Sequence, residues 1–291
     1  LELSSFQLHT MRFSPTVAIV TNVTPNHLNW HTSMDEYVES KKNIYLSQKN
    51  DARLVLNAEN EITREMAKGA PSHVTLFSSK RKPENVPCCY YENETVYYDD
   101  GNGAEAIMTR TDIKIVGMHN VENYMAAISA VMEYVSAEGM REVARTFGGV
   151  RHRIELVTEK AGVRYYNSSI DSSPTRSLAA LASFDEPLIV IAGGYDKHIP
   201  LEPLISSLAA KAKSIVLTGQ TGAMLLSLLL EYGYPRENIA YIGDFDAAVR
   251  YAASVAREGD TVLLSPAAAS FDAFKNFEAR GDRFCELVRK L

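Results

Sequence analysis

The sequence has few cysteines and no long apolar run, and both absences narrow the class of protein. Its three cysteines are Cys88, Cys89 and Cys285, and they form neither a C-x-x-C metal spacing nor a paired disulfide framework, which indicates a reducing compartment. The longest apolar run, residues 224–230, already contains Ser227 and is far shorter than the roughly 18 residues that a membrane span needs. We therefore predict a cytoplasmic chain without membrane insertion.

The chain also lacks an excess of basic residues and two familiar nucleotide-binding motifs. Lys and Arg total 30 against 36 Asp and Glu, a net charge of −6, which argues against non-specific nucleic-acid binding. No G-x-G-x-x-G follows a predicted strand, so a dinucleotide site is not expected, and no phosphate loop ending in Gly-Lys-Ser or Gly-Lys-Thr is present. Because the chain opens at Leu1 without an initiator Met, we expect it to be part of a longer protein.

What is present is an ordinary globular composition, 46% hydrophobic and 23% charged over 291 residues, and this length favours two domains. Gly148-Gly149 is the natural joint, giving domains 1–149 and 150–291 and a hinge about which the second would move. Arg151 and Arg153 follow the joint, and on an extended segment they would share a face that holds an anion between the domains. Ordinary surface arginines on a linker are the alternative.

The first half is predicted to be mixed α/β. Residues 16–20 read as a buried parallel strand, followed by a loop in which His27 is either a site residue or a turn residue. Ser33 is expected to cap a helix running to about residue 48, with Lys41 in the centre of its apolar stripe. A lysine there must be paired, neutralised or snorkelling. We further expect strands at 53–57 and 73–77, a helix at 61–68 capped by Asn60, and a hairpin of 88–92 with 95–98.

A long helix at 119–137 is predicted next, with Asn120 as its N-cap and Asn123 near the same end, followed by a shorter helix at 140–147. The second half begins with a hairpin turning at 160–162. Strands at 188–192, 214–218, 238–242 and 261–264 alternate with helices, and the last helix is expected at about 271–290. This alternation predicts a parallel, Rossmann-like sheet with helices on both faces.

Polar loops follow three of the strands in the second half. They comprise residues 167–173, 193–197 and 265–270. Open α/β sheets bind ligands at the carboxyl ends of their strands, so we expect these loops to form one site, although Gly, Ser and Pro are also common in plain turns. The last of them would place a carboxylate on the first amides of the final helix.

Taken in order, the motifs of this chain resemble those of the Mur ligase family, specifically its D-glutamate-adding branch. The matching elements are Glu2-Leu3-Ser4-Ser5-Phe6-Gln7-Leu8, Asn22-Val23-Thr24 with His27, Tyr37 with Lys41, His119-Asn120-x-x-Asn123, His152-Arg153, Gly193-Gly194-x-x-Lys197, Ser265-Pro266-Ala267 and Ser270-x-Asp272-x-Phe274-Lys275-Asn276-Phe277-x-x-Arg280-Gly281. The last is the most specific, and together they span essentially the whole chain.

The resemblance implies the remainder of a central P-loop-type ATPase domain at 1–149 and a C-terminal Rossmann-like domain at 150–291 that binds D-glutamate and part of ATP. It implies ATP-dependent addition of D-glutamate to UDP-N-acetylmuramoyl-L-alanine through an acyl phosphate, with Mg²⁺, by a cytoplasmic monomer. Catalytic roles would fall to Lys41, His27 and Arg153. The metal ligands would be Glu2, His27 and Lys41 as a carbamate. ATP would be contacted by Asn120, Asn123 and Arg153, and the muramoyl substrate by Ser4. D-glutamate would be held by Lys197, Ser172, Ser270, Phe271 and Phe277.

Two departures from the family pattern remain. The phosphate loop is absent, so residues 1–291 alone are not expected to catalyse ligation. Ser168 and Ile170 stand where many members carry Asp and Lys. We expect Asp171 to supply the missing carboxylate towards ATP; the alternative is that it caps a helix beginning near Pro174. A folylpolyglutamate synthase-like ligase and a non-catalytic binding or regulatory protein are the competing functional interpretations.

Overall fold

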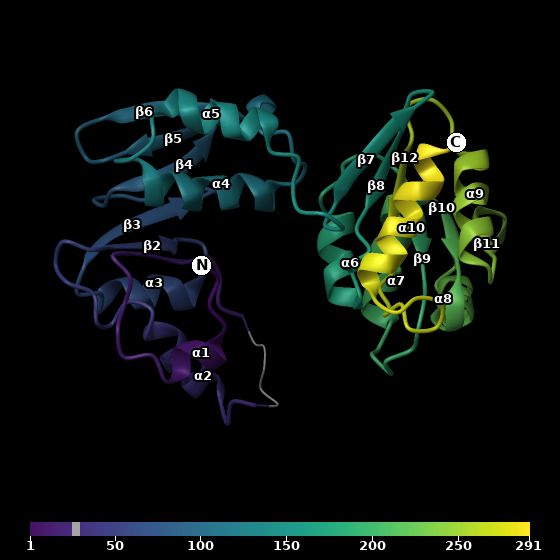
Figure 1. The fold of residues 1–291 in the computed structure, drawn as a ribbon, viewed down its shortest axis with the longest axis horizontal. Coiled ribbons are helices and arrows are strands. Elements are labelled where there is room, and N and C mark those ends of the chain that lie inside the picture. The colour runs from purple at the N-terminus through teal and green to yellow at the C-terminus, as the bar shows by residue number, and fades with distance from the viewer. Residues whose placement is uncertain (25–29) are drawn as a thin grey trace. The chain divides into compact units, whose positions relative to one another are not determined.

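The computed structural model describes residues 1–24 and 30–291, which form two compact units (Figure 1). The first comprises Leu1–Lys114 and Met118–Phe147, and the second comprises Ile115–Gly117 and Gly148–Leu291. The short segment Ile115–Gly117 thus belongs to the second unit although the chain around it belongs to the first, and the partly buried Val116 packs on a core of the second unit. In the described part of the chain, no helix combines the length and apolarity needed to cross a bilayer.

The sheet of the first unit, as described, has six strands in chain order. They are β1 Val17–Val20, β2 Arg53–Asn57, β3 His73–Ser78, β4 Cys88–Glu92, β5 Thr95–Asp99 and β6 Ala104–Thr109. Strands β1 to β4 are parallel, whereas β5 and β6 are added antiparallel, which confirms the mixed α/β prediction and the hairpin. β1 lies at one end of the described sheet; Ala18 and Val20 are buried whereas Ile19 is 36% exposed, so the prediction of a buried parallel strand is confirmed for one face of the strand.

Five α-helices are described in the first unit, and apart from the first, which packs on the second, they bury apolar residues against the sheet. They are α1 Ser5–His9, α2 Met34–Lys42, α3 Glu61–Lys68, α4 Met118–Val131 and α5 Ala137–Thr146, with a 3₁₀ turn, η1, at Arg110–Asp112. α3 begins as predicted because the Asn60 side chain accepts a hydrogen bond from the Thr63 amide (3.1 Å). The predicted stripe of α2 is confirmed: Tyr37 and Tyr45 are buried in one cluster with Leu54 and Leu56 of β2.

Three helix boundaries of the first unit differ from the predictions. α2 ends at Lys42, because the backbone amides of Ile44 and Tyr45 donate to the carbonyls three residues earlier, which tightens the last turn. The side-chain nitrogen of Asn43 then donates to the Leu8 carbonyl (2.9 Å). α4 begins at Met118, directly after Gly117 with its φ of 95°, so Asn120 is the third helical residue and not the N-cap; it also ends at Val131, six residues early. α5 begins at Ala137 rather than 140 because Ser136 caps it.

The sheet of the second unit has the order β11-β10-β9-β12-β8-β7 in the described chain. Its strands are β7 Glu155–Lys160, β8 Val163–Asn167, β9 Leu188–Ala192, β10 Ala212–Leu217, β11 Ile239–Tyr241 and β12 Thr261–Leu264. All neighbours are parallel except the β7–β8 hairpin, which turns through Ala161 and Gly162 as predicted. The Rossmann-like prediction is confirmed.

Helices cover both faces of this sheet and create two cores (Figure 1). On one face lie α6 Pro174–Leu181, α7 Glu202–Lys211 and α8 Gly219–Glu231; on the other lie α9 Phe245–Val255 and α10 Phe277–Arg289, and a 3₁₀ turn, η2, spans Arg236–Asn238. The inward residues of β9 alternate between the cores: Leu188, Val190 and Ala192 join the first, and Ile189 and Ile191 join the second. A strand buried on both faces has to be apolar throughout, as β9 is.

Two predictions for the second unit were wrong. The last helix begins at Phe277 instead of residue 271, because Asn276 has an extended backbone and is the N-cap. Its side chain accepts a hydrogen bond from the Ala279 amide (2.9 Å), so the residues before Asn276 are not part of the helix. The amides after Ser270 are therefore not the start of that helix. Arg151 and Arg153 are not on an extended segment, because His152 between them has a left-handed backbone with φ of 64°.

Candidate active site

The three polar loops of the second unit meet at one edge of the sheet, as predicted. β8, β12 and β9 are parallel neighbours, so the loops after them emerge side by side. Backbone hydrogen bonds join them: the Ser168 amide donates to Leu264 (2.8 Å), Gly193 to Pro266 (2.8 Å) and Tyr195 to Ala269 (2.9 Å). The edge is therefore a single bonded surface and not three independent turns.

The buried side chain of Arg280 connects the loops of this surface. Its side chain is 2% exposed, and its guanidinium donates to the Ser169 hydroxyl (3.0 Å) and to the carbonyls of Ser169 (2.9 Å), Ala268 (3.1 Å) and Ala269 (3.0 Å). Burial lowers the pKa of Arg280 to about 10, and the negative charges of Asp272 and Asp171 oppose that shift. The planar fork of an arginine suits three carbonyls from two loops, whereas a lysine could not reach them all.

Two glycines let the backbones approach this closely. A Cβ on Gly193 would lie 2.0 Å from the Thr218 carbonyl oxygen, and one on Gly194 would lie 2.2 Å from that of Ala269. Both have positive φ, 111° and 154°. The Gly-Gly of the loop is thus required by the geometry of the edge itself.

Asp171 lies inside this edge and not at a helix end. It is 5% exposed, and the Ser265 hydroxyl donates to its carboxylate (2.9 Å). Burial raises its pKa, opposed by hydrogen bonds from Ser168 and Ser265 and by the charges of Arg176 and Arg153. The N-cap of α6 is Ser173, so the interpretation of Asp171 as that cap was wrong. Asp171 and Arg153, both predicted for ATP, lie within electrostatic reach of one another.

Three of the residues predicted for D-glutamate lie on the two loops after β9 and β12. Lys197 is exposed, and Phe271 is 62% exposed with its ring 5.9 Å from that of Tyr195. Ser270 is buried, and its carbonyl accepts from the Phe274 amide (2.8 Å). The two loops thus present an ammonium and an aromatic ring to solvent.

Ser172 and Phe277 complete that set from the loop after β8 and from α10. Ser172 follows Asp171 directly, and its amide donates to Ile170 (2.7 Å). Phe277 is the first residue of α10; its carbonyl accepts from the Ser169 hydroxyl (2.8 Å). All five predicted D-glutamate residues therefore belong to elements that meet at one edge of the sheet.

In the first unit, two predicted metal ligands lie near one another. Burial lowers the pKa of Lys41, and the negative charge of Glu2 opposes that shift. The Lys41 ammonium lies 5.2 Å from the centre of the Tyr37 ring. Mg²⁺ prefers oxygen ligands, so Glu2 fits as it stands, whereas Lys41 fits only as a carbamate, which requires the neutral amine that burial favours. His27 lies outside the described residues.

The remaining predicted residues are Ser4, Asn120, Asn123 and Arg153, and the first three form local hydrogen bonds. Ser4 forms a reciprocal capping box with Gln7 at the start of α1, its amide donating to the Gln7 side chain (2.9 Å). Asn120 and Asn123 face each other on α4, with the Asn123 amide donating to Asn120 (3.3 Å). Arg153 is exposed on the turn before β7.

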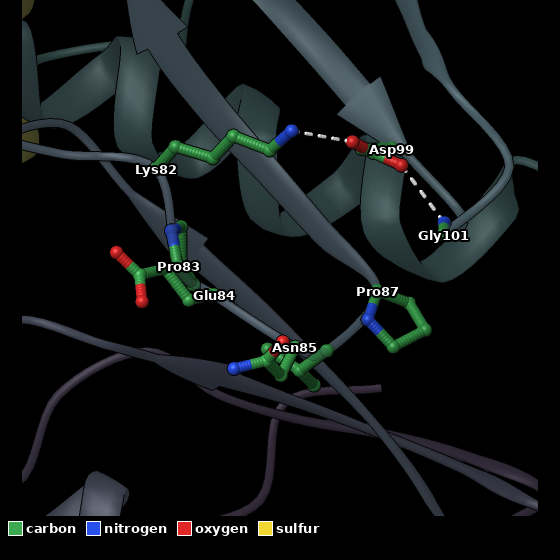
Figure 2. Close-up of a pocket in the computed structure, with 8 residues that line it drawn as sticks. Lys82, Pro83, Glu84, Asn85, Pro87, Asp99 and Gly101 are labelled. Atoms are coloured by element: carbon green, nitrogen blue, oxygen red, sulfur yellow. Dashed lines mark hydrogen bonds and ion pairs between the residues drawn. The ribbon is translucent and has the colours of Figure 1, made fainter.

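A hollow of about 620 Å³ beside β4 and β5 contains none of the predicted site residues. It is lined by Lys82, Pro83, Glu84, Asn85, Val86, Pro87, Asp99 and Gly101. Figure 2 shows Lys82 directed at Asp99, to which it donates (2.6 Å), while the Gly101 amide donates to the other carboxylate oxygen (2.8 Å). Lys82 and Asp99 are thus already paired with each other, and we assign the hollow no role.

Sequence reasoning missed Arg280 and His152 as organising residues of the edge. Both stood in quoted motifs but received no role. A lone arginine in an amphipathic helix gives no sign of burial, because Arg is mostly exposed. The signal that could have found it is the adjoining Gly281, a helix-weakening residue that indicates close contact.

Comparisons with known proteins cover both units of the chain. Residues 1–131 match the Mur ligase middle domain, and residues 152–268 match the Mur ligase, glutamate ligase domain. The UDP-N-acetylmuramoylalanine–D-glutamate ligases of Clostridium perfringens and Clostridium beijerinckii are 49% and 50% identical over 298 and 295 residues. Those alignments cover 100% of this chain and 63% of each relative, so the chain spans about 63% of the length of the curated relatives it matches.

Solved structures show the same fold at lower identity. The UDP-N-acetylmuramate-alanine ligase MurC of Thermotoga maritima is 17% identical with a TM-score of 0.69, covering 99% of this chain and 62% of that one. FolC of E. coli, solved in complex with DHPP and ADP, is 15% identical with a TM-score of 0.62, covering 94% and 62%. Because both domain matches and the relatives near 50% identity agree along the chain, it belongs to the Mur ligase family.

Proposed function

We propose that this chain provides the Mg²⁺-binding and D-glutamate-binding parts of an ATP-dependent ligase that joins D-glutamate to UDP-N-acetylmuramoyl-L-alanine. The observation that carries the proposal is the identity of 49–50% along the whole chain to ligases named for D-glutamate. The bonded edge of the second unit supports it, because its loops expose Lys197 and Phe271 and bury the carboxylate of Asp171. We expect a cytoplasmic monomer.

In the first unit, Glu2, His27 and carbamylated Lys41 would hold Mg²⁺. The ion would neutralise phosphate charge while the substrate carboxylate becomes an acyl phosphate. Asn120 and Asn123 would donate to ATP, and Ser4 would lie near the muramoyl substrate. Lys41 needs to lose its proton first, and its partial burial favours that loss.

In the second unit, Arg153 and Asp171 would contact ATP, while Lys197, Ser172, Ser270, Phe271 and Phe277 would hold D-glutamate. Lys197 would bind a carboxylate of the amino acid, and the exposed Phe271 ring would cover its methylene groups. Arg280 does not face solvent, and it acts by fixing the loops that carry these residues.

Binding of D-glutamate to residues 1–291 tests the second-unit assignment without requiring turnover. Calorimetry should detect D-glutamate binding that Lys197→Ala weakens by at least about tenfold. Lys290→Ala, an exposed lysine paired with Glu286 on α10, is the matched control and should bind as the unchanged chain does. Equal affinity in all three proteins would refute the role of Lys197.

Turnover needs a phosphate loop, which can be supplied by fusing the preceding part of the Clostridium perfringens ligase ahead of Leu1. The fusion should release ADP only when D-glutamate and UDP-N-acetylmuramoyl-L-alanine are both present. ADP release with a folate and L-glutamate would instead favour the folylpolyglutamate synthase-like alternative. Substrate binding without any ADP release in a folded fusion would favour the non-catalytic alternative.

A further inference from the structure

A second candidate metal centre lies in the first unit and consists of residues other than those assigned to Mg²⁺. His9, His31 and Glu36 each offer one ligand atom, and these three atoms lie within 4.8 Å of one another. They come from the end of α1, from the segment before α2 and from the first turn of α2. Two imidazoles and one carboxylate are the ligand set of many zinc sites that keep an open position.

The buried member of the cluster has an unsatisfied nitrogen. His31 is 2% exposed and its Nε2 is 2.9 Å from the Ser5 hydroxyl, whereas its Nδ1 has no hydrogen-bond partner among residues 1–24 and 30–291. A buried polar atom without a partner costs free energy, so such an atom calls for an explanation. A cation accepting the Nδ1 lone pair would provide one, with the Ser5 hydroxyl fixing the ring from the other side.

The hydrogen bonds of Ser40 fix the tautomer of His9. The Ser40 hydroxyl donates to the Glu36 carbonyl (2.8 Å), so its single proton is already used. The oxygen of Ser40 must therefore accept from His9 Nδ1, 2.9 Å away, which leaves the lone pair of a neutral imidazole on Nε2. This is the pattern of a metal-ligating histidine, whose other nitrogen donates to a fixed acceptor.

Glu36 is oriented by a third set of bonds. The amide and hydroxyl of Thr32 both donate to Oε2 (2.6 Å each). These bonds fix the carboxylate and leave Oε1 available as a ligand atom. Bonds to zinc of roughly 2.0–2.2 Å place neighbouring ligand atoms about 3.3 Å apart, so small side-chain rotations would close the site.

We propose that His9, His31 and Glu36 bind Zn²⁺ or a similar late first-row divalent cation, which ties the end of α1 to the start of α2. Nitrogen-rich sites favour these ions over Mg²⁺, which prefers oxygen ligands. The tie would fix the two elements that carry Ser4 and Lys41.

Trp30 offers a direct readout of this site. It is the only tryptophan of the chain, and its ring lies 4.5 Å from that of His31 and 5.4 Å from that of His9. Titrating residues 1–291 with Co²⁺ should quench its fluorescence with saturation at one equivalent. Zn²⁺ should reverse the quenching at stoichiometric concentration, whereas a large excess of Mg²⁺ should not.

Variants locate the effect. His9→Gln and Glu36→Gln change partly exposed side chains and should each weaken Co²⁺ binding by at least about tenfold. His73→Gln, an exposed histidine on β3, should bind as the unchanged chain does. Circular dichroism of each variant establishes that it is folded. Absence of saturable quenching, or equal quenching in folded His9→Gln and Glu36→Gln, would overturn the proposal.

Discussion

Gly281 lacks a side chain at the point where the His152 ring lies against α10. A Cβ there would stand 2.2 Å from His152 Nδ1 and 3.1 Å from the Asn167 amide nitrogen. That amide nitrogen is itself 3.0 Å from His152 Nδ1. The absence of a side chain at Gly281 therefore allows the buried His152 to pack beside α10, the helix that carries Arg280.

Gly281→Ala should destabilise the second unit by about 1–3 kcal/mol, because the added methyl group overpacks a filled contact. In an open helix the same change would stabilise by roughly 0.5–1 kcal/mol, so the sign identifies the clash. Chemical denaturation measures the difference. Gly243→Ala is the matched control, since nothing lies within 4 Å of a Cβ at that position and the free energy of unfolding should change little.

Arg280→Lys should destabilise the second unit by about 3–5 kcal/mol, because it leaves buried carbonyls of Ala268, Ala269 and Ser169 without their donors and buries a point charge. Arg250→Lys, on the exposed side of α9, should change the free energy of unfolding by less than about 0.5 kcal/mol. A small effect at Arg280 would mean that the loops hold their shape without it.

Asp171→Asn should make stability less dependent on pH. Burial raises the pKa of Asp171, so the folded state holds its proton more tightly than the unfolded state does. Below its unfolded pKa of about 3.9, the carboxyl therefore does not lower the free energy of unfolding. The destabilisation by the carboxyl grows as the pH rises through the folded pKa. Asparagine carries no such cost. Urea unfolding measures the free energy of unfolding at pH 4 and pH 7. Relative to the unchanged chain, the variant should be more stable at pH 7 than at pH 4. The same difference in free energy at both pH values would contradict the buried charge.

The same substitution separates two roles in the fusion protein. If Asp171 contacts ATP, Asp171→Asn should raise the KM for ATP or lower kcat while melting of the unliganded protein changes little. A change in melting alone would make Asp171 a structural residue of the edge.

Lys41 should form a carbamate with CO₂ more readily than its neighbour on α2. Burial lowers its pKa and so supplies the neutral amine at lower pH. With ¹³C-labelled bicarbonate, NMR should show a carbamate signal that Lys41→Arg removes and Lys42→Arg leaves. In the fusion protein, Lys41→Arg should reduce activity far more than Lys42→Arg does. Equal effects of the two substitutions would contradict the carbamate hypothesis.

Residues 148–291 should fold alone and unfold in one cooperative transition. Their sheet carries a core on each face, built almost wholly from residues after Gly148. Val116 is the described exception, so restoring Ile115–Gly117 should add little. Non-cooperative melting of the separate unit, followed by circular dichroism, would contradict this.

Much of the fold followed from local sequence. Continuous apolar runs bounded by turns placed β9 and β12 to the residue, and the Asn60 cap placed α3, because burial on both faces and capping are properties of a few consecutive residues. Parallel alternation then determined that three loops share one edge, since strands joined by crossover helices must point the same way.

Tertiary structure alone decided the contacts between residues distant in sequence. Arg280 looks like a surface residue until four oxygen atoms from the loops after β8 and β12 converge on it. Asp171 looks like a helix cap until Ser265, 94 residues away, donates to it. His9, His31 and Glu36 share no spacing that predicts a metal site. Short-range rules encode secondary structure, whereas burial and pairing depend on which loops the folded sheet brings together.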